Sequence, residues 1–265
     1  MLRLKENKKG QFIIIATLLI SIMIISVATI MYGAVTYFRH ERWEEYLGVI
    51  DAIETNSHRL MEASLANYTL TGNPMILKAN MDKWQRDLMK TYTGHGIVLR
   101  SSLANGTQTI YGATLQFSEG LATEWNEQVS FSAANATFDL NMTAIGLSGY
   151  KFITPVFLKM NITDALYHPA SDEVGVRLII QQENLVFVTD LQAANFIVFE
   201  IDGVSKNVTS RHYFDSQTHN AFIYELRYVH GGSNPGTLGN VTIGVVDTRG
   251  IKVTGQALNV TVTDA

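Results

Sequence analysis

The longest uninterrupted apolar stretch of the chain runs over residues 11–38. These 28 residues contain no Asp, Glu, Lys or Arg, and 14 of them are Ile, Leu, Val or Phe. An α-helix of this length is roughly 40 Å long and exceeds the hydrocarbon thickness of a bilayer, about 30 Å. The pattern predicts a transmembrane helix over 11–38.

Apolar residues then recur at helical spacing from Arg39 to about Asn67, without proline or a turn cluster. That stripe consists of Trp43, Leu47, Ile50, Ile53, Leu60, Met61 and Leu65. A second helix is predicted from Asn73 as N-cap and Pro74 as first helical residue to about Tyr92, before Gly94 and Gly96. Its apolar face consists of Leu77, Met81, Trp84, Leu88 and Tyr92. We therefore expect a helical hairpin outside the membrane over 39–95.

Beyond Ile97 the apolar period shortens towards two, which is typical of strands. The alternation predicts a small β-rich region over 96–168, with strands at 128–131 and 136–142 and a short helix over 118–125. Over 169–265 we expect an immunoglobulin-like β-sandwich with turns at Asp202-Gly203 and Arg249-Gly250. The eight strands predicted there are 174–181, 185–189, 196–201, 204–208, 221–230, 241–247, 251–256 and 258–263.

The predicted fold class is therefore α+β: a long N-terminal transmembrane helix extended into a helical hairpin, followed by antiparallel β domains. The formal net charge is only −4, so nothing indicates a nucleic-acid partner. The chain has no cysteine, which excludes disulfides, thiol nucleophiles and zinc sites with Cys ligands.

Basic residues concentrate before the apolar stretch. Residues 1–10 form a leader with Arg3, Lys5, Lys8 and Lys9 against Glu6. By the positive-inside rule this leader stays in the cytoplasm. We therefore expect a single-pass protein of the cell membrane whose residues 39–265 lie on the outer side.

The junction Lys8-Lys9-Gly10-Gln11, followed by the uncharged run, resembles the class III signal peptide of archaeal type IV pilins and archaellins. The resemblance implies that a prepilin-type membrane peptidase cuts between Gly10 and Gln11, and that the apolar helix stays on the mature chain. It also implies a protruding helix with a β-rich head. Ile15 departs from the glutamate that many type IV pilins carry at this place, which leaves polymerisation open. The alternative is an uncleaved single-pass anchor.

A stripe of small residues runs along the predicted span at spacings of three and four. It consists of Ser26, Thr29, Gly33 and Thr36. Such stripes allow close helix packing, here with like subunits in a filament or a membrane oligomer. Ser and Thr are equally tolerated in single helices, where they bond to their own backbone.

The chain contains eight N-x-T sequons, all beyond the predicted span, whereas chance predicts roughly two or three. Their asparagines are Asn67, Asn105, Asn135, Asn141, Asn161, Asn207, Asn240 and Asn259. We expect a glycosylated outer part. The alternative is that Asn-Val-Thr at 207, 240 and 259 reflects ordinary strand alternation.

Phosphate loops, zinc-protease motifs, nucleophile elbows and calcium loops are absent from the sequence. We therefore predict no enzyme activity, no catalytic residue and no cofactor. His212, Asp215 and His219 could meet on one loop and bind a metal, but a surface loop is the simpler interpretation and no metal site is predicted. The glycine-rich segment 231–239 is interpreted as a hairpin loop, and such loops can form recognition tips.

Two functions fit this sequence. The first is a pilin-like structural or adhesive surface protein, such as a minor filament subunit, with a glycosylated β-rich head. The second is an anchored receptor or solute-binding ectodomain that does not polymerise.

Overall fold

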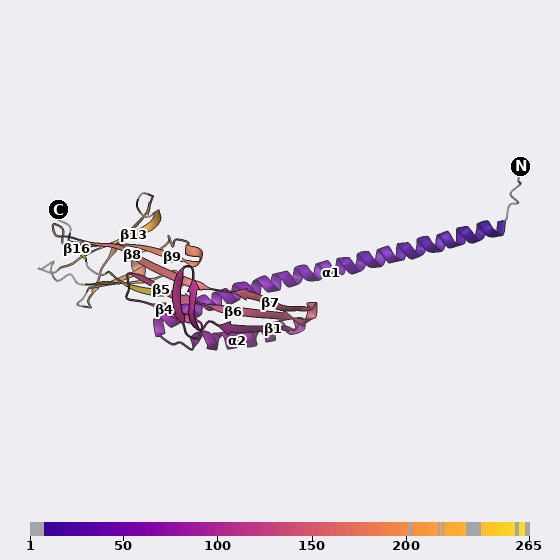
Figure 1. The fold of residues 1–265 in the computed structure, drawn as a ribbon, viewed down its shortest axis with the longest axis horizontal. Helices are drawn as coiled ribbons and strands as arrows, with labels where there is room; N and C mark the ends of the chain where they lie inside the picture. Colours follow the sequence, from indigo (N-terminus) through magenta and orange to yellow (C-terminus); the bar gives the residue numbers. More distant parts are fainter. Residues whose placement is uncertain are drawn as a thin grey trace. The chain divides into compact units, whose positions relative to one another are not determined.

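The computed structural model describes residues 8–200, 203–216, 218, 220–231, 240–257 and 260–262, without the side chains of 8–12 and 36–45. The chain divides into two compact units, Met1–Ile53 and Glu54–Ala265. Helix α1 (Lys8–Thr71) contributes residues to both. The fold is α+β, with helices followed by antiparallel sheets, as the sequence predicts (Figure 1).

In the first unit, the segment Ile13–Val35 of α1 is long and apolar enough to cross a membrane or to serve as a signal sequence. All its large apolar side chains are exposed, from 50% for Ile22 to 76% for Tyr32. Nearer the end of this unit Ile50 and Ile53 are buried, as the predicted stripe requires. Leu47 belongs to the same predicted stripe but is exposed, which corrects that assignment.

In the second unit, the end of α1 pairs with α2 (Ile76–Thr91) as a helical hairpin. Asn80 Nδ2 donates to Ser64 Oγ at 2.9 Å, and Trp84 Nε1 donates to Ser57 Oγ at 3.3 Å. Helix α1 ends at Thr71 rather than near Asn67, because Gly72 takes the left-handed conformation and its N–H donates to Tyr68 O.

The start of α2 also differs from the prediction. The helix begins at Ile76, two residues after the expected Pro74, and its N-cap position is Met75. Asn73 still acts locally, because its Oδ1 accepts the N–H of Met75 at 3.0 Å. The helix ends at Thr91 as expected and continues into the 3₁₀ turn η1 (Thr93–His95) before Gly96.

A three-stranded antiparallel sheet of order β1-β6-β7 packs against α2, which lies along β1 in Figure 1. Its strands are β1 (Ile97–Leu103), β6 (Ala136–Met142) and β7 (Leu147–Ile153), with the 3₁₀ turn η2 (Thr143–Ile145) between β6 and β7. Gln85 Nε2 of α2 donates to Ser101 Oγ of β1, which joins helix and sheet.

A seven-stranded sheet forms the centre of the second unit, in the order β12-β13-β9-β8-β5-β4, with β16 beside β8. Only β16 is parallel to its neighbour. The strands are β4 (Leu121–Glu124), β5 (Val129–Ala134), β8 (Val156–His168), β9 (Glu173–Gln182), β12 (Thr209–Asp215), β13 (Ala221–Val229) and β16 (Thr261–Val262). The sheet therefore takes strands from both predicted regions, 96–168 and 169–265.

Both faces of this sheet are partly covered. A four-stranded sheet of order β11-β10-β14-β15 lies on it through contacts of β15 with β5 and β8. Its strands are β10 (Phe196–Phe199), β11 (Ser205–Lys206), β14 (Val241–Val246) and β15 (Lys252–Ala257). The hairpin of β2 (Gly106–Ile110) and β3 (Ala113–Phe117) adds a further apolar cluster with Phe157 of β8.

Several predicted elements are wrong. The short helix over 118–125 is instead a turn and β4, because Glu119 and Gly120 have positive φ and Leu121 and Ala122 are buried. The strand over 185–189 is replaced by the 3₁₀ turn η3 (Glu183–Leu185) and an isolated bridge at Phe187, and η4 (Ala193–Asn195) follows.

Two further differences concern strands near the end of the chain. The segment 209–215, interpreted as part of a loop, is the strand β12. The strand predicted over 258–263 is described only at 260–262, where β16 is two residues long.

Candidate functional site

The turn between β14 and β15 carries the most connected polar side chain of the second unit, Arg249. Asp247 shapes this turn, since its Oδ1 accepts the N–H groups of Arg249 at 3.0 Å and Ile251 at 2.8 Å. Gly250 closes it with a φ of +84°. The turn predicted at Arg249-Gly250 is thus confirmed, and its geometry points the guanidinium into the interior.

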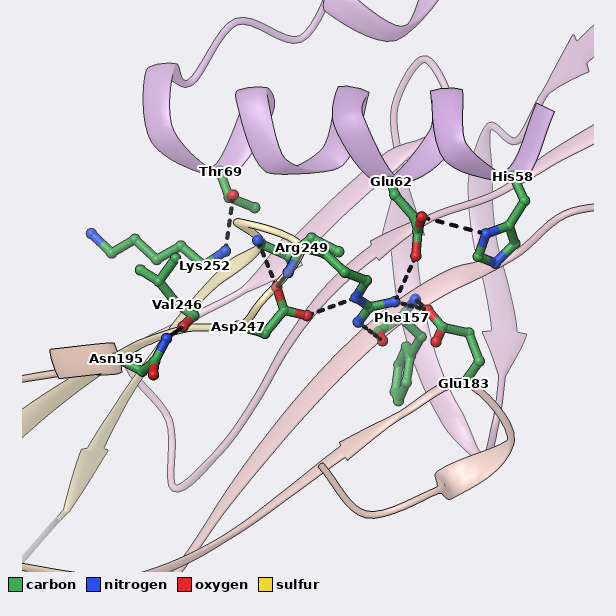
Figure 2. A network of polar contacts seen from close by, with 11 residues as sticks. His58, Glu62, Thr69, Phe157, Glu183, Asn195, Val246, Asp247, Arg249 and Lys252 are labelled. Carbon is green, nitrogen blue, oxygen red and sulfur yellow. Dashed lines mark hydrogen bonds and ion pairs between the residues drawn. The ribbon is translucent and has the colours of Figure 1, made fainter. Parts of the chain in front are cut away.

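Figure 2 shows how the Arg249 guanidinium joins four segments of the second unit. Nη1 lies 2.7 Å from Glu183 Oε1 and 3.4 Å from Glu62 Oε1 of α1. Nε lies 2.8 Å from Asp247 Oδ2, and Nη2 donates to the Phe157 carbonyl at 3.3 Å. The side chain is only 17% exposed, so these contacts replace the water that the cation gives up.

Glu183 has a second role at the start of β8. Its Oε1 also accepts the Phe157 N–H at 2.8 Å. The carboxylate therefore holds the backbone of Phe157 and the Arg249 guanidinium at once. Neighbouring bonds extend the network, since Lys252 N–H donates to Thr69 Oγ1 at 3.1 Å and Asn195 Nδ2 donates to Val246 O at 2.8 Å (Figure 2).

The electrostatics of this network follow from three carboxylates around one guanidinium. Burial raises the pKa of Asp247 above its ordinary value despite the nearby cation. Burial acts to lower the pKa of Arg249, but Asp247 and Glu183 outweigh it and the pKa is raised. The interaction with His58 Nδ1, at 3.6 Å, lowers the pKa of Glu62, and the same interaction raises the pKa of His58.

A groove of about 540 Å³ opens beside this network. Its walls combine carboxylates and a histidine with aromatic and aliphatic side chains. They include Glu54, His58, Tyr111, Phe152, Ile153 and Glu183. The volume lies in the range of small-molecule sites, roughly 300–1,000 Å³.

Two turns in left-handed backbone conformation border the groove. Tyr111 has a φ of +48°, and Asn184 and Leu185 have φ values of +57° and +59°. Such conformations are costly for residues with side chains, and they recur at ligand-binding positions. Tyr111 is further fixed by its ring, which meets that of Phe157 edge-on at 5.4 Å between centroids.

The arrangement holds several segments of the second unit together through charged hydrogen bonds. Within the described residues no group of three or more His, Asp or Glu side chains is placed to hold a metal. His212 and Asp215 point to opposite faces of β12, and His219 lies outside the described residues. The segment 232–239 of the predicted recognition loop also lies outside them.

The predicted processing residues, Gly10 and Gln11, lie in the first turn of α1, which begins at Lys8. In the predicted packing stripe Ser26, Thr29 and Gly33 are exposed, and the side chain of Thr36 lies outside the described part. Thr29 Oγ1 donates to its own helix at Ile25 O, 2.8 Å away. Helix packing through the stripe stays a prediction.

The sequon asparagines differ in exposure. Asn67, Asn105 and Asn207 are exposed, whereas Asn135, Asn141, Asn161 and Asn240 are half-buried. Asn135 is the most constrained, because its Nδ2 donates to Gln108 Oε1 and its Oδ1 is buried. Asn259 lies outside the described residues.

Sequence reasoning missed the Arg249 network and the groove. Glu62, Glu183 and Arg249 are ordinary charged residues with no shared motif, and Glu62 and Arg249 are 187 positions apart. Comparison of the chain with protein-family models, curated proteins and solved structures gives no match.

Proposed function

We propose that this chain is a pilin-like surface protein: inserted in the membrane by Ile13–Val35, cut between Gly10 and Gln11, and presenting its β-rich unit outside the cell. It acts there as a structural or adhesive component, as a minor filament subunit does. One observation carries the proposal, namely that every large apolar side chain of this segment is at least 50% exposed. Such a surface needs lipid or neighbouring helices to cover it.

The polar groups of the segment support this proposal. Thr17 Oγ1 donates to Ile13 O at 2.7 Å, and Ser21 Oγ donates to Thr17 O at 2.8 Å. Thr29 is bonded in the same way to Ile25 O. Because these hydroxyls bond within the helix, they carry no unsatisfied donor into an apolar environment. The segment can therefore exchange lipid contacts for contacts with neighbouring helices at little polar cost.

The Arg249 network supports a mechanical role. It fixes the last turns of α1 to β8, η3 and the β14–β15 turn through charged hydrogen bonds. A force applied to residues 54–71 is then distributed over several strands of the β-rich unit rather than carried by one loop.

The test is the mass of the mature protein recovered from its own cell membranes. We expect an N-terminus at Gln11 in the wild type and an uncut chain for Gly10→Val, with Gly33→Val as the control that is still cut. Mechanical shearing should release wild-type protein in filaments. An intact Met1 terminus, or protein recovered only as detergent-soluble monomer, contradicts the filament proposal.

The groove beside the network favours a second candidate, a solute-binding ectodomain. Its volume of about 540 Å³ and its mixed lining of aromatic and charged groups fit a small polar ligand. Thermal-shift measurements with a panel of sugars and short peptides test this. A ligand that stabilises the wild type but not Ile153→Arg, which places a charge in the groove, supports it.

A further inference from the structure

The strand β12 lies at the end of the seven-stranded sheet. Among the strands that the structure describes, it pairs only with β13, in a register that sets Arg211 opposite Glu225 and Tyr213 opposite Ile223. An edge strand leaves half of its backbone N–H and C=O groups without a strand partner. At seven residues, β12 is long enough to accept another strand.

This edge exposes aromatic side chains. Phe214 is 56% exposed and Tyr213 is 36% exposed. His212 packs on Phe222 of β13 with 5.1 Å between ring centroids, which adds a side-chain contact to the pairing of the two strands. Exposed aromatic surface at a sheet edge is typical of protein–protein contacts.

A row of alternating charges crosses the sheet and ends at this edge. Arg177 Nη1 lies 3.7 Å from Asp164 Oδ2, and Arg177 Nε lies 3.8 Å from Glu225 Oε2. Glu225 is bonded in turn by Arg211 Nη2 at 2.7 Å. The row therefore runs from a carboxylate on β8 through Arg177 on β9 to Glu225 on β13, which Arg227 of the same strand also bonds at 2.7 Å, and it ends in a cation on β12. The side chain of Arg211 is 60% exposed, so its guanidinium has N–H donors that a further acceptor can reach.

β12 itself contains a carboxylate, Asp215, that can accept from the Arg211 donors of a second copy. In an antiparallel pair of two β12 strands centred on Tyr213, Arg211 faces Asp215 of the second copy, and Asp215 faces Arg211. His212 then faces Phe214, and the two Tyr213 residues face each other. Opposite charges and aromatic pairs at facing positions stabilise antiparallel strands. The arrangement has two-fold symmetry, because each copy contributes the same surface to the contact.

We propose that two copies of this protein associate through their β12 edges, antiparallel and centred on Tyr213, so that the seven-stranded sheets of two heads become continuous. The second copy is favoured over an unrelated partner because the segment 211–215 is complementary to itself. Parallel pairing in register sets Arg211 against Arg211, and a shift of the antiparallel register by one residue sets it opposite Phe214 or Ser216, neither of which carries a charge. The proposal holds whether or not the N-terminal segment forms filaments.

Another edge strand of the second unit lacks these properties. β7 carries Gly149 and Lys151, a register irregularity separates its pairing at Leu140 and Met142, and Pro155 follows it. Lysine, bulges and proline are features that protect edges from pairing. β12 has no proline, and its charges attract rather than repel a second β12.

The absence of cysteine makes a direct test possible in the full chain. In Tyr213→Cys the two thiols of a pair face each other at a Cα separation of about 4.5–5.5 Å, which a disulfide can bridge. In the control Ser210→Cys, residue 210 faces residue 216, so the two thiols are six residues apart along the strands, roughly 20 Å. Under mild oxidation of detergent-solubilised protein we expect at least about tenfold more covalent dimer from Tyr213→Cys.

The Ser210→Cys control also distinguishes this pairing from association through the membrane helix. That association would bring the two thiols together to the same extent in Tyr213→Cys and in Ser210→Cys. Maleimide labelling checks that the two thiols are equally accessible. Equal cross-linking of equally accessible thiols overturns the proposal.

A charge test addresses the register. Asp215→Arg in the Tyr213→Cys chain sets the new arginine of one copy opposite Arg211 of the other. Because these like charges repel, we expect several-fold less covalent dimer. Asp215→Asn keeps an oxygen for the Thr218 N–H, which Asp215 Oδ1 now accepts, and should give an intermediate yield. Asp82→Arg, the same charge change on α2, should leave the yield unchanged. Undiminished dimer from folded Asp215→Arg, with a wild-type melting temperature, overturns the pairing of Arg211 with Asp215.

Discussion

At the scale of single residues, Arg249 is the side chain on which the second unit depends most. It is in contact with three carboxylates and a backbone carbonyl, and those groups belong to α1, β8, η3 and its own turn. Its turn could be predicted from the pair Arg249-Gly250, because a turn depends on neighbours in sequence. Its partners could not, since Glu183 and Glu62 are 66 and 187 positions away.

We expect Arg249→Met to lower the free energy of unfolding by about 3–5 kcal/mol, because it leaves the buried Asp247 and the half-buried Glu183 without a cation. The control is Arg86→Met on α2, where Arg86 is exposed and its Nε bonds to Asp82 O of the same helix. That change should stay within about 0.5 kcal/mol. Urea unfolding followed by tryptophan fluorescence measures both. Equal losses in the two variants contradict the assigned role.

His58 should make stability depend on pH. Its pKa is raised mainly by Glu62, with Glu183 adding to the effect and burial and Arg249 opposing it. A histidine with a raised folded-state pKa contributes stability that is complete below the unfolded pKa, about 6.5, and is lost as pH rises through the folded-state value. The melting temperature of the wild type should therefore fall over that window relative to His58→Gln.

The matched variant for this pH effect is Glu62→Gln, which removes the carboxylate that raises the pKa of His58. It should weaken the pH dependence of the melting temperature. A difference between wild type and His58→Gln that stays constant from pH 5 to pH 8 contradicts the assignment, since about 6.5 lies inside that range.

At the scale of elements, the helices were predictable and β12 was not. The buried positions of α2, which are Leu77, Met81 and Leu88, all belong to the predicted stripe, because one side of the helix packs and the other faces water. β12 has no such contrast, since five of its seven residues are exposed and none is buried. An edge strand with both faces open leaves no alternation of apolar and polar positions to detect.

The helical hairpin is open to a packing test. Leu77 is fully buried, and its Cδ2 occupies the space beside Gly120. Leu77→Ala should lower the free energy of unfolding by about 2–5 kcal/mol, because it leaves a cavity. Leu70→Ala, at an exposed position of α1, should change it by less than about 0.5 kcal/mol. A loss at Leu77 no larger than that at Leu70 contradicts this packing.

At the scale of the whole molecule, the apolar segment predicted as a span can be tested by a single charge. Ile25→Arg places a guanidinium near the middle of Ile13–Val35, at a cost of about 2.5–3.5 kcal/mol on the insertion scale. We expect less protein in the membrane fraction. Val229→Arg, at an exposed position of the β-rich unit, should leave fractionation unchanged. Identical membrane fractions for both variants contradict insertion by this segment.

Glycan mapping tests the outward placement of the β-rich unit. If it is exported to a glycosylating compartment, peptides containing the exposed Asn67, Asn105 and Asn207 should carry glycans most often. The peptide containing Asn135 should carry least, because both atoms of its amide are engaged or buried. Full occupancy at Asn135 with none at Asn67 contradicts this ranking.

The bond between Thr69 Oγ1 and the Lys252 N–H joins residues that are 183 positions apart. A ribosome therefore makes the helical residue long before its partner exists. Until the β14–β15 turn has been synthesised, residues 54–71 lack Arg249 and Lys252. Native contacts of such long range cost much loop-closure entropy and form late. The second unit should accordingly pass from a loosely held helix to its native state only when the final hairpin docks, which makes a chain truncated before residue 241 a target for proteolysis.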